Sequence, residues 1–283
     1  MTTPPYDGPP KTLDFSGMSE YEKCPLLYKW NRLDRKKPSV PDNSYYAICG
    51  IVKQKLFEDF YNKEWWRKGA ECAPYMEGLA ESYFNATLEW AKVDWNNPIA
   101  KLSKEQLIEE VRSGVRKGIK IIKDQKLLTK DSKSEVKLTA TLKNKINILG
   151  KVDFIIRHSP EKVWIIDGKD TAKPDKMPKV DHRQLLFYSL LYYENYGVYP
   201  EKVGFMFWRH DDVLYYDPKK GMDEILKWTE DTYWKVRNGK FDPKPSSSNC
   251  HFCKYKNDCE AYTREVKEGG VTFADDVTEI NLF

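Results

Sequence analysis

The sequence predicts an α/β fold in which helices flank a mixed central sheet. Helical periodicity fills the first part of the chain, three strand-like segments follow one another between residues 134 and 169, and helical and strand patterns alternate after that. We therefore expect a helical N-terminal part, a sheet built by the middle of the chain, and a C-terminal segment that carries cysteines.

Several helices are predicted ahead of the first strand. Ser19 and Glu22 have the spacing of a capping box, so a helix is expected to begin there. Apolar residues at helical spacing predict helices over 44–62, 75–91 and 104–127, and 96–103 is expected to be a loop. The helix over 104–127 has an apolar stripe beside a basic face.

The second half of the chain contains the predicted strands. β-branched residues and short polar turns predict strands over 134–142, 146–157 and 162–169. A helix is expected over 180–196, strands over 202–209 and 212–216, and a final helix over 221–238. This order of elements predicts the mixed sheet.

Composition limits the class of protein. The chain has 283 residues, of which 40% are hydrophobic and 32% charged, so we expect a soluble globular protein with one large core, or with one core and a smaller lobe. No apolar run approaches the roughly 20 residues that span a bilayer, so no membrane is expected among its partners. The N-terminus lacks a signal-peptide pattern, so a cytoplasmic location is expected. We predict an extended segment over 1–12, one domain over 13–262 and a tail over 263–283.

The net charge of the chain is +4, yet basic residues are concentrated in residues 112–145. Such a run is either a solvated helix face or a surface that binds phosphate groups. The charge pattern alone leaves both interpretations open.

Polar residues interrupt the predicted strands. Asp167 and Lys169 are two residues apart at the end of an apolar strand, and they therefore point to the same face. Asp153 lies on the preceding strand in a G-x-x-D segment that begins at Gly150, and Glu135 lies on the strand before that. Taken singly, DGK is also common as a strand-end turn with a surface ion pair; the combination of the two motifs is more specific.

Carboxylates beside a lysine suit metal-dependent hydrolysis of phosphodiesters. A hard cation such as Mg²⁺ or Mn²⁺ prefers oxygen ligands, which Asp153, Asp167, the carbonyl of Gly168 and Glu135 could supply. Lys169 could orient the attacking water or stabilise charge that develops on the phosphate.

The same set of residues resembles the PD-(D/E)XK nucleases of the RecB-like branch. In that branch a glutamate precedes a G-x-x-D strand, and D/E-x-K is followed by Q-x-x-x-Y on a helix; Gln184 and Tyr188 stand at these last positions. The resemblance implies a restriction-endonuclease-like fold with the mixed sheet described above. It also implies a Mg²⁺- or Mn²⁺-dependent deoxyribonuclease, an exonuclease on DNA ends or single strands, in recombination, repair or replication. Gln184 and Tyr188 would line the site and contact DNA or the lysine.

One position departs from the family pattern. A G-x-x-x-H helix often precedes the three strands, and the matching stretch here begins at Gly50 and ends in Gln54. Glutamine is a poorer metal ligand than histidine and does not take up a proton at neutral pH. A DNA-binding module with weak or lost catalysis is therefore an alternative interpretation.

Four of the six cysteines form a pattern. Cys250, Cys253 and Cys259 make a C-x2-C-x5-C segment, and Cys24 stands in a Cys-Pro context near the other end of the chain. Structural disulfides are rare in the expected compartment, and four thiolates can hold either a [4Fe–4S] cluster or a zinc ion. By spacing alone both occupants stay open.

This arrangement of cysteines resembles the iron-staple nucleases, which include AddB and the iron–sulfur nuclease of CRISPR adaptation. In these nucleases one cysteine precedes the nuclease core and three follow it. The resemblance implies a [4Fe–4S] cluster on Cys24, Cys250, Cys253 and Cys259, which we call the iron–sulfur staple, with zinc as the less favoured occupant. The zinc alternative corresponds to an interaction protein in which DGK is only a turn.

Two features suggest partners in addition to DNA. The sequence has no G-x4-G-K-[ST] segment, so any helicase activity must come from a partner. Residues Glu279 to Phe283 resemble the short peptides that dock on bacterial-type sliding clamps. The same residues could instead pack on the chain itself or fray.

Overall fold

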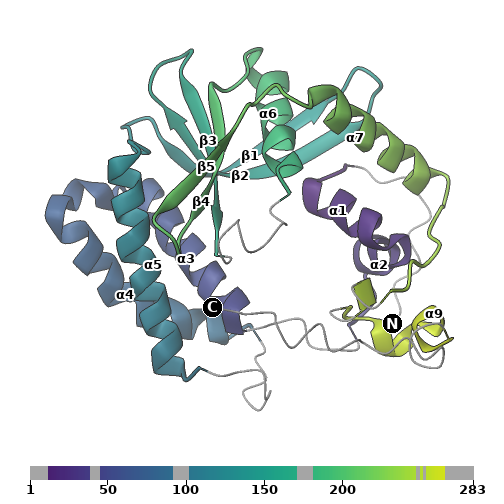
Figure 1. The fold of residues 1–283 in the computed structure, drawn as a ribbon, viewed down its shortest axis with the longest axis horizontal. Coiled ribbons are helices and arrows are strands. Elements are labelled where there is room, and N and C mark those ends of the chain that lie inside the picture. The colour runs from purple at the N-terminus through teal and green to yellow at the C-terminus, as the bar shows by residue number, and fades with distance from the viewer. Residues whose placement is uncertain are drawn as a thin grey trace. The chain divides into compact units, whose positions relative to one another are not determined.

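The computed structural model describes residues 12–38, 45–91, 102–170, 181–246, 249–250 and 253–264 (Figure 1). The extended segment expected ahead of residue 12 and most of the loop predicted over 96–103 lie outside the described residues. The tail from residue 265 onward also lies outside them, and with it the clamp-like peptide.

Five strands form one mixed sheet in the order in which they follow along the chain. The strands are β1 (Lys133–Thr141), β2 (Asn147–Arg157), β3 (Val163–Lys169), β4 (Lys202–Phe207) and β5 (Asp212–Tyr216). β2 and β3 are antiparallel, β3 and β4 are parallel, and β4 and β5 are antiparallel. The predicted strands differ from these bounds by at most two residues.

The other regular elements of the described chain are helices. The α-helices are α1 (Phe15–Lys23), α2 (Pro25–Tyr28), α3 (Tyr45–Asn62), α4 (Cys72–Leu88), α5 (Lys104–Asp124), α6 (Arg183–Tyr196), α7 (Met222–Arg237) and α9 (Glu260–Tyr262). There are also a π-helix over Lys29–Leu33 and 3-10 helices over Trp65–Glu71 and Lys256–Asp258.

The first helix begins earlier than the capping-box spacing at Ser19 predicts. Asp14 is the N-terminal cap, because its Oδ1 accepts a hydrogen bond of 2.7 Å from the backbone N–H of Gly17. Ser19 and Glu22 therefore lie inside the helix. A complete capping box is found instead at the start of α5, between Ser103 and Gln106.

Helices cover both faces of the sheet. Ile166 of β3 belongs to a large hydrophobic core that includes apolar side chains of α3, α4 and α5. The next residue, Asp167, contacts Gln184 of α6. Because successive residues of a strand point to opposite faces, α3 to α5 lie on one face and α6 lies on the other. The predicted fold class, an α/β fold of restriction-endonuclease-like type, is confirmed.

The chain divides into two compact units. One unit comprises residues 43–138 and 150–222 and contains β3 to β5 with α3 to α6; the other comprises residues 1–42, 139–149 and 223–283. In the second unit Tyr21, Tyr28 and Val236 form a small buried cluster. Each candidate site described below lies within a single unit.

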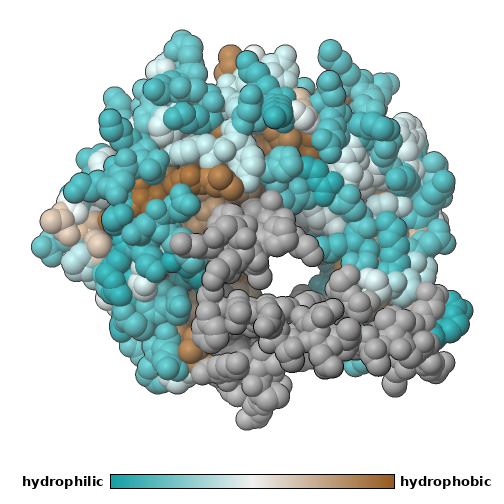
Figure 2. All heavy atoms as spheres, viewed as in Figure 1, coloured by the Kyte–Doolittle hydropathy of each residue, from teal (hydrophilic) through white to brown (hydrophobic). Residues whose placement is uncertain are grey.

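The large apolar side chains are mostly buried. On the face drawn in Figure 2, the described surface is predominantly hydrophilic, with hydrophobic side chains exposed over limited areas. Within the described ranges, we find no helix with both the length and the apolar character of a membrane span.

Candidate metal and nucleic-acid site

Asp153, Asp167 and Lys169 lie together where β2 and β3 run side by side. Asp167 is 2% exposed, and its Oδ2 lies 2.6 Å from Nζ of Lys169. Asp153 accepts a hydrogen bond of 2.9 Å at Oδ2 from the backbone N–H of Gly168. This bond joins the G-x-x-D strand to the D-x-K strand, so residues of two separate motifs share one site.

Helix α6 adds an amide that bridges the carboxylate and the ammonium. Nε2 of Gln184 donates to Oδ1 of Asp167 at 2.9 Å, and Oε1 of Gln184 accepts from Nζ of Lys169 at 2.8 Å. The Tyr188 hydroxyl accepts from the same Nε2 at 3.0 Å. The i, i+4 spacing places Gln184 and Tyr188 on one helix face, as expected. Gln184 thereby sets the position of Lys169 relative to Asp167.

Glu135 is held from two other elements. Its Oε1 accepts a hydrogen bond of 2.5 Å from Nε2 of Gln54 on α3, and its Oε2 pairs with the ammonium of Lys151 on β2. Glu135 also has a φ of 56° inside β1, a left-handed conformation that non-glycine residues rarely adopt in a strand. A residue of this kind redirects its side chain, at a cost on the order of 1–3 kcal/mol. Gln54, at the position of the family's histidine, therefore does contact a candidate site residue.

Burial dominates the electrostatics of these groups. Burial, followed by the Asp167 carboxylate, raises the pKa of Asp153 well above its ordinary range, although the Gly168 N–H opposes the shift. Burial also raises the pKa of Asp167, against the opposing effect of Lys169. For Tyr188, burial and then Asp167 raise the pKa, so the hydroxyl stays protonated. A buried and a half-buried carboxylate side by side, with one lysine between them and solvent, are short of positive charge, and a divalent cation is a group that fits them.

The two motif glycines are required by close packing. A Cβ built on Gly168 would lie 2.3 Å from the Trp208 ring, and one on Gly150 would lie 2.5 Å from Cδ1 of Leu191. Side chains at these positions would displace neighbours that support the site. The glycines of DGK and G-x-x-D therefore permit the approach of Trp208 and α6.

A buried charge network beside the site was not predicted from the sequence. Lys53 is fully buried, and its Nζ lies 2.7 Å from Oδ1 of Asp170, the residue after Lys169. Nε of Arg209 lies 3.1 Å from the same oxygen. A Cβ on Gly114 would lie 2.6 Å from Cε of Lys53, so the lysine stem passes directly over that glycine. The sequence feature that could have indicated this network is a lysine, Lys53, within the apolar stretch of α3.

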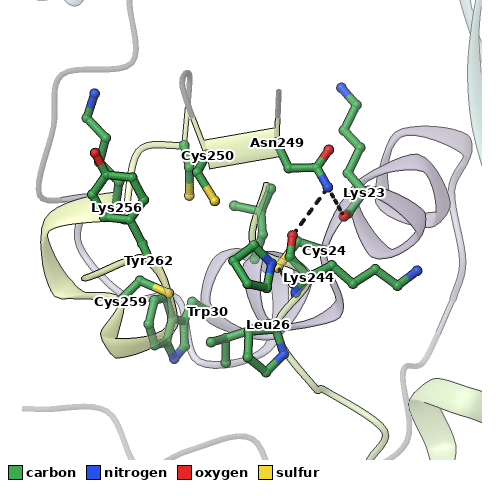
Figure 3. Close-up of a pocket in the computed structure, with 14 residues that line it drawn as sticks. Lys23, Cys24, Leu26, Trp30, Lys244, Asn249, Cys250, Lys256, Cys259 and Tyr262 are labelled. Atoms are coloured by element: carbon green, nitrogen blue, oxygen red, sulfur yellow. Dashed lines mark hydrogen bonds between the residues drawn. The ribbon is translucent and has the colours of Figure 1, made fainter. Parts of the chain in front are cut away.

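The four predicted cysteines surround one pocket in the second unit. The pocket is lined by Cys24, Cys250, Cys253 and Cys259, with Trp30 and Tyr262 among the other lining residues (Figure 3). Burial raises the pKa of the Cys253 thiol, and the other three thiols raise it further. All six cysteines lie in the described ranges, and none is in a disulfide.

Neither site is a complete metal-binding group as it stands. Among the described residues, no three His, Cys, Asp or Glu side chains are gathered in a way that could hold a metal ion. The remaining cysteines, Cys49 and Cys72, are buried core residues, and burial raises the pKa of Cys49 to about 12.

Much of the basic face of α5 is paired with acidic side chains. Arg116 pairs with Glu77 and Glu109, and Lys120 pairs with Asp124 and Asp211. These pairs favour the solvated-face interpretation of that part of the basic run over the phosphate-binding one.

Comparison with protein families then defines the class. A model of the PD-(D/E)XK nuclease superfamily matches residues 12–260, and the chain therefore belongs to that superfamily. The superfamily implies a nuclease that acts on the phosphodiester bonds of nucleic acid, and its members generally use divalent metal ions such as Mg²⁺.

Comparisons with individual proteins add little. No curated protein matches the chain. A solved structure described as "Crystal structure of SSO0001" is similar over 54% of this chain and 74% of that one, at 22% identity and a TM-score of 0.32. A similarity this low supports no inference about activity.

Proposed function

We propose that this protein is a cytoplasmic, metal-dependent deoxyribonuclease of the RecB-like branch. It hydrolyses DNA phosphodiesters, as an exonuclease on ends or single strands, in recombination, repair or replication. The observation that carries the proposal is the bridge by which Gln184 holds Lys169 and Asp167 next to Asp153. Residues 13–262 act together as the nuclease domain.

Glu135, Asp153, Asp167 and the carbonyl of Gly168 would hold Mg²⁺ or Mn²⁺. The fit rests on the chemistry of the donors, since carboxylate oxygens are the ligands that these ions prefer and burial leaves the two aspartates short of positive charge. A bound ion supplies Lewis acidity, which polarises a phosphate oxygen and makes a water molecule more acidic.

The protein side chains supply orientation and charge. The side chain of Lys169 is 22% exposed, so its ammonium can reach a phosphate while Gln184 keeps it in place. It either orients the attacking water or stabilises negative charge that develops on the phosphate. Tyr188 remains protonated and acts through its contact with Gln184.

The test is a Mg²⁺-dependent cleavage assay on linear single- and double-stranded DNA with the full-length protein. Lys169→Ala is expected to lower the cleavage rate by at least a hundredfold, the scale lost when a preorganised charge is removed, while DNA binding persists. Lys227→Ala, which removes an exposed lysine of α7, is the matched control and should cleave normally. Cleavage by Lys169→Ala at the wild-type rate would disprove the assignment.

A second candidate function is DNA binding with weak or lost catalysis. Gln54 favours this second function, because its amide contacts Glu135 at the position where the RecB-like pattern often has the imidazole of a histidine. The same assay separates the two functions: a wild-type protein that binds DNA tightly but cleaves none in either Mg²⁺ or Mn²⁺ is a binding module.

We also propose that Cys24, Cys250, Cys253 and Cys259 hold a [4Fe–4S] cluster as the iron–sulfur staple. The support is their common pocket and the softness of four thiolates, which suits iron–sulfur clusters and zinc. Iron and zinc contents of protein purified without oxygen decide between the occupants. A colourless protein with stoichiometric zinc would favour the zinc-stapled interaction protein. A helicase partner, or a sliding clamp bound by the tail, is a further proposal within this function.

A further inference from the structure

The Glu135 carboxylate is occupied by the protein's own groups. Its side chain is 10% exposed, and its two oxygens are taken by Gln54 and by Lys151. In the proposed function the same carboxylate is a metal ligand. A metal ion that binds Glu135 therefore competes with these two groups for the negative charge of the carboxylate.

Lys151 is the partner that can leave most easily. Its side chain is 61% exposed, against 22% for Lys169, so its ammonium can turn into the surrounding water and regain full hydration. Gln54 is neutral and does not oppose a cation electrostatically. Lys151 does oppose it, since a second positive charge at Glu135 competes with the ion for the same negative charge.

Lys151 is also placed beside the reacting groups. It lies on β2 two residues before Asp153, and Asp153 is joined to Gly168 of the D-x-K strand. A lysine side chain released from Glu135 at this position stays next to the carboxylates that the proposed metal would occupy. The anion available there is a phosphate of bound nucleic acid.

We propose that Lys151 is a displaceable cation that neutralises Glu135 in the metal-free protein and contacts a backbone phosphate of the nucleic acid once metal is bound. This inference rests on the proposed function and deepens it. It assigns Lys151 as a substrate-positioning residue that the sequence motifs do not mark.

Such an exchange couples metal binding to nucleic-acid binding. Without nucleic acid, Lys151 weakens metal binding, because the ion must displace it. With metal bound, the freed ammonium strengthens nucleic-acid binding. Coupling of this kind is reciprocal, so each ligand raises the affinity for the other.

The experiment measures binding with the full chain and the variant Lys151→Met. Mn²⁺ is titrated calorimetrically without DNA, and a labelled single-stranded oligonucleotide is titrated with EDTA and with Ca²⁺, which avoids a readout through cleavage. Lys151→Met should bind Mn²⁺ about fivefold more tightly than the wild type. The expected factor is modest because the removed charge, although it contacts Glu135, is largely exposed and therefore screened by water. Lys151→Met should also lose most of the gain in DNA affinity that Ca²⁺ gives the wild type.

Two control variants make the result specific. Lys137→Met removes an exposed lysine from the same strand as Glu135 and should change neither measurement. Lys151→Arg keeps the charge and should restore the wild-type coupling.

The contrary outcomes are distinct. Unchanged Mn²⁺ affinity in Lys151→Met, with a wild type that binds Mn²⁺ and cleaves DNA, overturns this inference and leaves the proposed function intact. Loss of DNA affinity in EDTA as large as in Ca²⁺ would make Lys151 a simple DNA-binding lysine and also overturns it. A wild type that neither binds Mn²⁺ nor cleaves DNA contradicts both proposals.

Discussion

Asp167 is buried and Asp153 is half-buried, and their carboxylates destabilise the metal-free fold. Each loses contact with water, each is close to the other, and Lys169 neutralises only part of the resulting charge. A carboxyl whose pKa is higher in the folded than in the unfolded state opposes folding above the folded pKa. That penalty disappears as the pH falls toward the ordinary aspartate value of about 3.9.

Asp153→Asn is therefore expected to stabilise the metal-free protein at neutral pH. Asparagine keeps an oxygen for the Gly168 N–H and removes the buried charge, so its melting temperature should exceed that of the wild type by a few degrees, about 1 kcal/mol or more. The advantage should shrink as the pH is lowered through the folded pKa of Asp153. Thermal unfolding in EDTA at several pH values measures it.

Bound metal should reverse the order of the two melting temperatures, so that the wild type becomes the more stable protein. Saturating Mn²⁺ stabilises the form that binds it, so the wild type should gain melting temperature and Asp153→Asn should gain little. An equal Mn²⁺-induced gain in both proteins would remove Asp153 from the proposed ligands.

The sequence predicts the motif residues but not all of their neighbours. Strand alternation predicts that Asp167 and Lys169 share a face, and the two strands before them carry Asp153 and Glu135. The resemblance to the PD-(D/E)XK nucleases adds Gln184 and Tyr188, which helical spacing places on one face. The contact between Lys53 and Asp170 joins positions 117 residues apart, and the Glu135 backbone at φ 56° has no local signal. Long-range pairs of this kind follow from packing, which a motif does not encode.

At the scale of elements, ion pairs connect helix α3 with the end of strand β3. Lys53 on α3 and Arg209, two residues beyond β4, both pair with Asp170, which directly follows β3. Gln54, the next residue of α3, reaches Glu135 on β1. The network therefore sets the helix against the strands that carry the candidate site.

Removing Asp170 and removing Lys53 should lower the free energy of unfolding by different amounts. Asp170→Asn removes the carboxylate that the fully buried Lys53 shares with Arg209 and leaves Lys53 with the more distant Glu110, at 3.9 Å. It should lower the free energy of unfolding by about 3–5 kcal/mol. Lys53→Met leaves Asp170 paired with Arg209 and should cost less. Urea unfolding measures both, and the double variant should be more stable than Asp170→Asn alone. If Lys53→Met were the more destabilising change, Arg209 would not be an effective partner.

The predicted elements were most accurate where the local pattern is strong. All five strands and the helices α3 to α7 were expected, because periodicity and turn residues mark them. The start of α1 was placed at Ser19 instead of Phe15, since several polar residues there can cap a helix and only tertiary structure selects Asp14. The π-helix over Lys29–Leu33 has no such sequence pattern.

At the scale of the whole molecule, the proposed iron–sulfur staple would connect Cys24 with a segment that begins at Cys250. A cross-link between positions this far apart removes much of the conformational freedom of the unfolded chain. All four cysteines belong to one compact unit, whose described parts come from both ends of the sequence. Ligand binding and the stability of that unit are therefore expected to be linked.

Cys24→Ser should lower iron content and stability together. If the cluster acts as a cross-link over a loop of this length, its loss should cost about 4–5 kcal/mol, or roughly 10 °C in melting temperature. Iron analysis and anaerobic thermal unfolding of the full chain measure the two effects. Cys72→Ser, which alters a buried thiol outside the pocket, is the control and should keep its iron even if it is less stable. Full iron content and an unchanged melting temperature in Cys24→Ser would show that Cys24 is not a ligand and that the cluster does not cross-link the N-terminal part to the C-terminal segment.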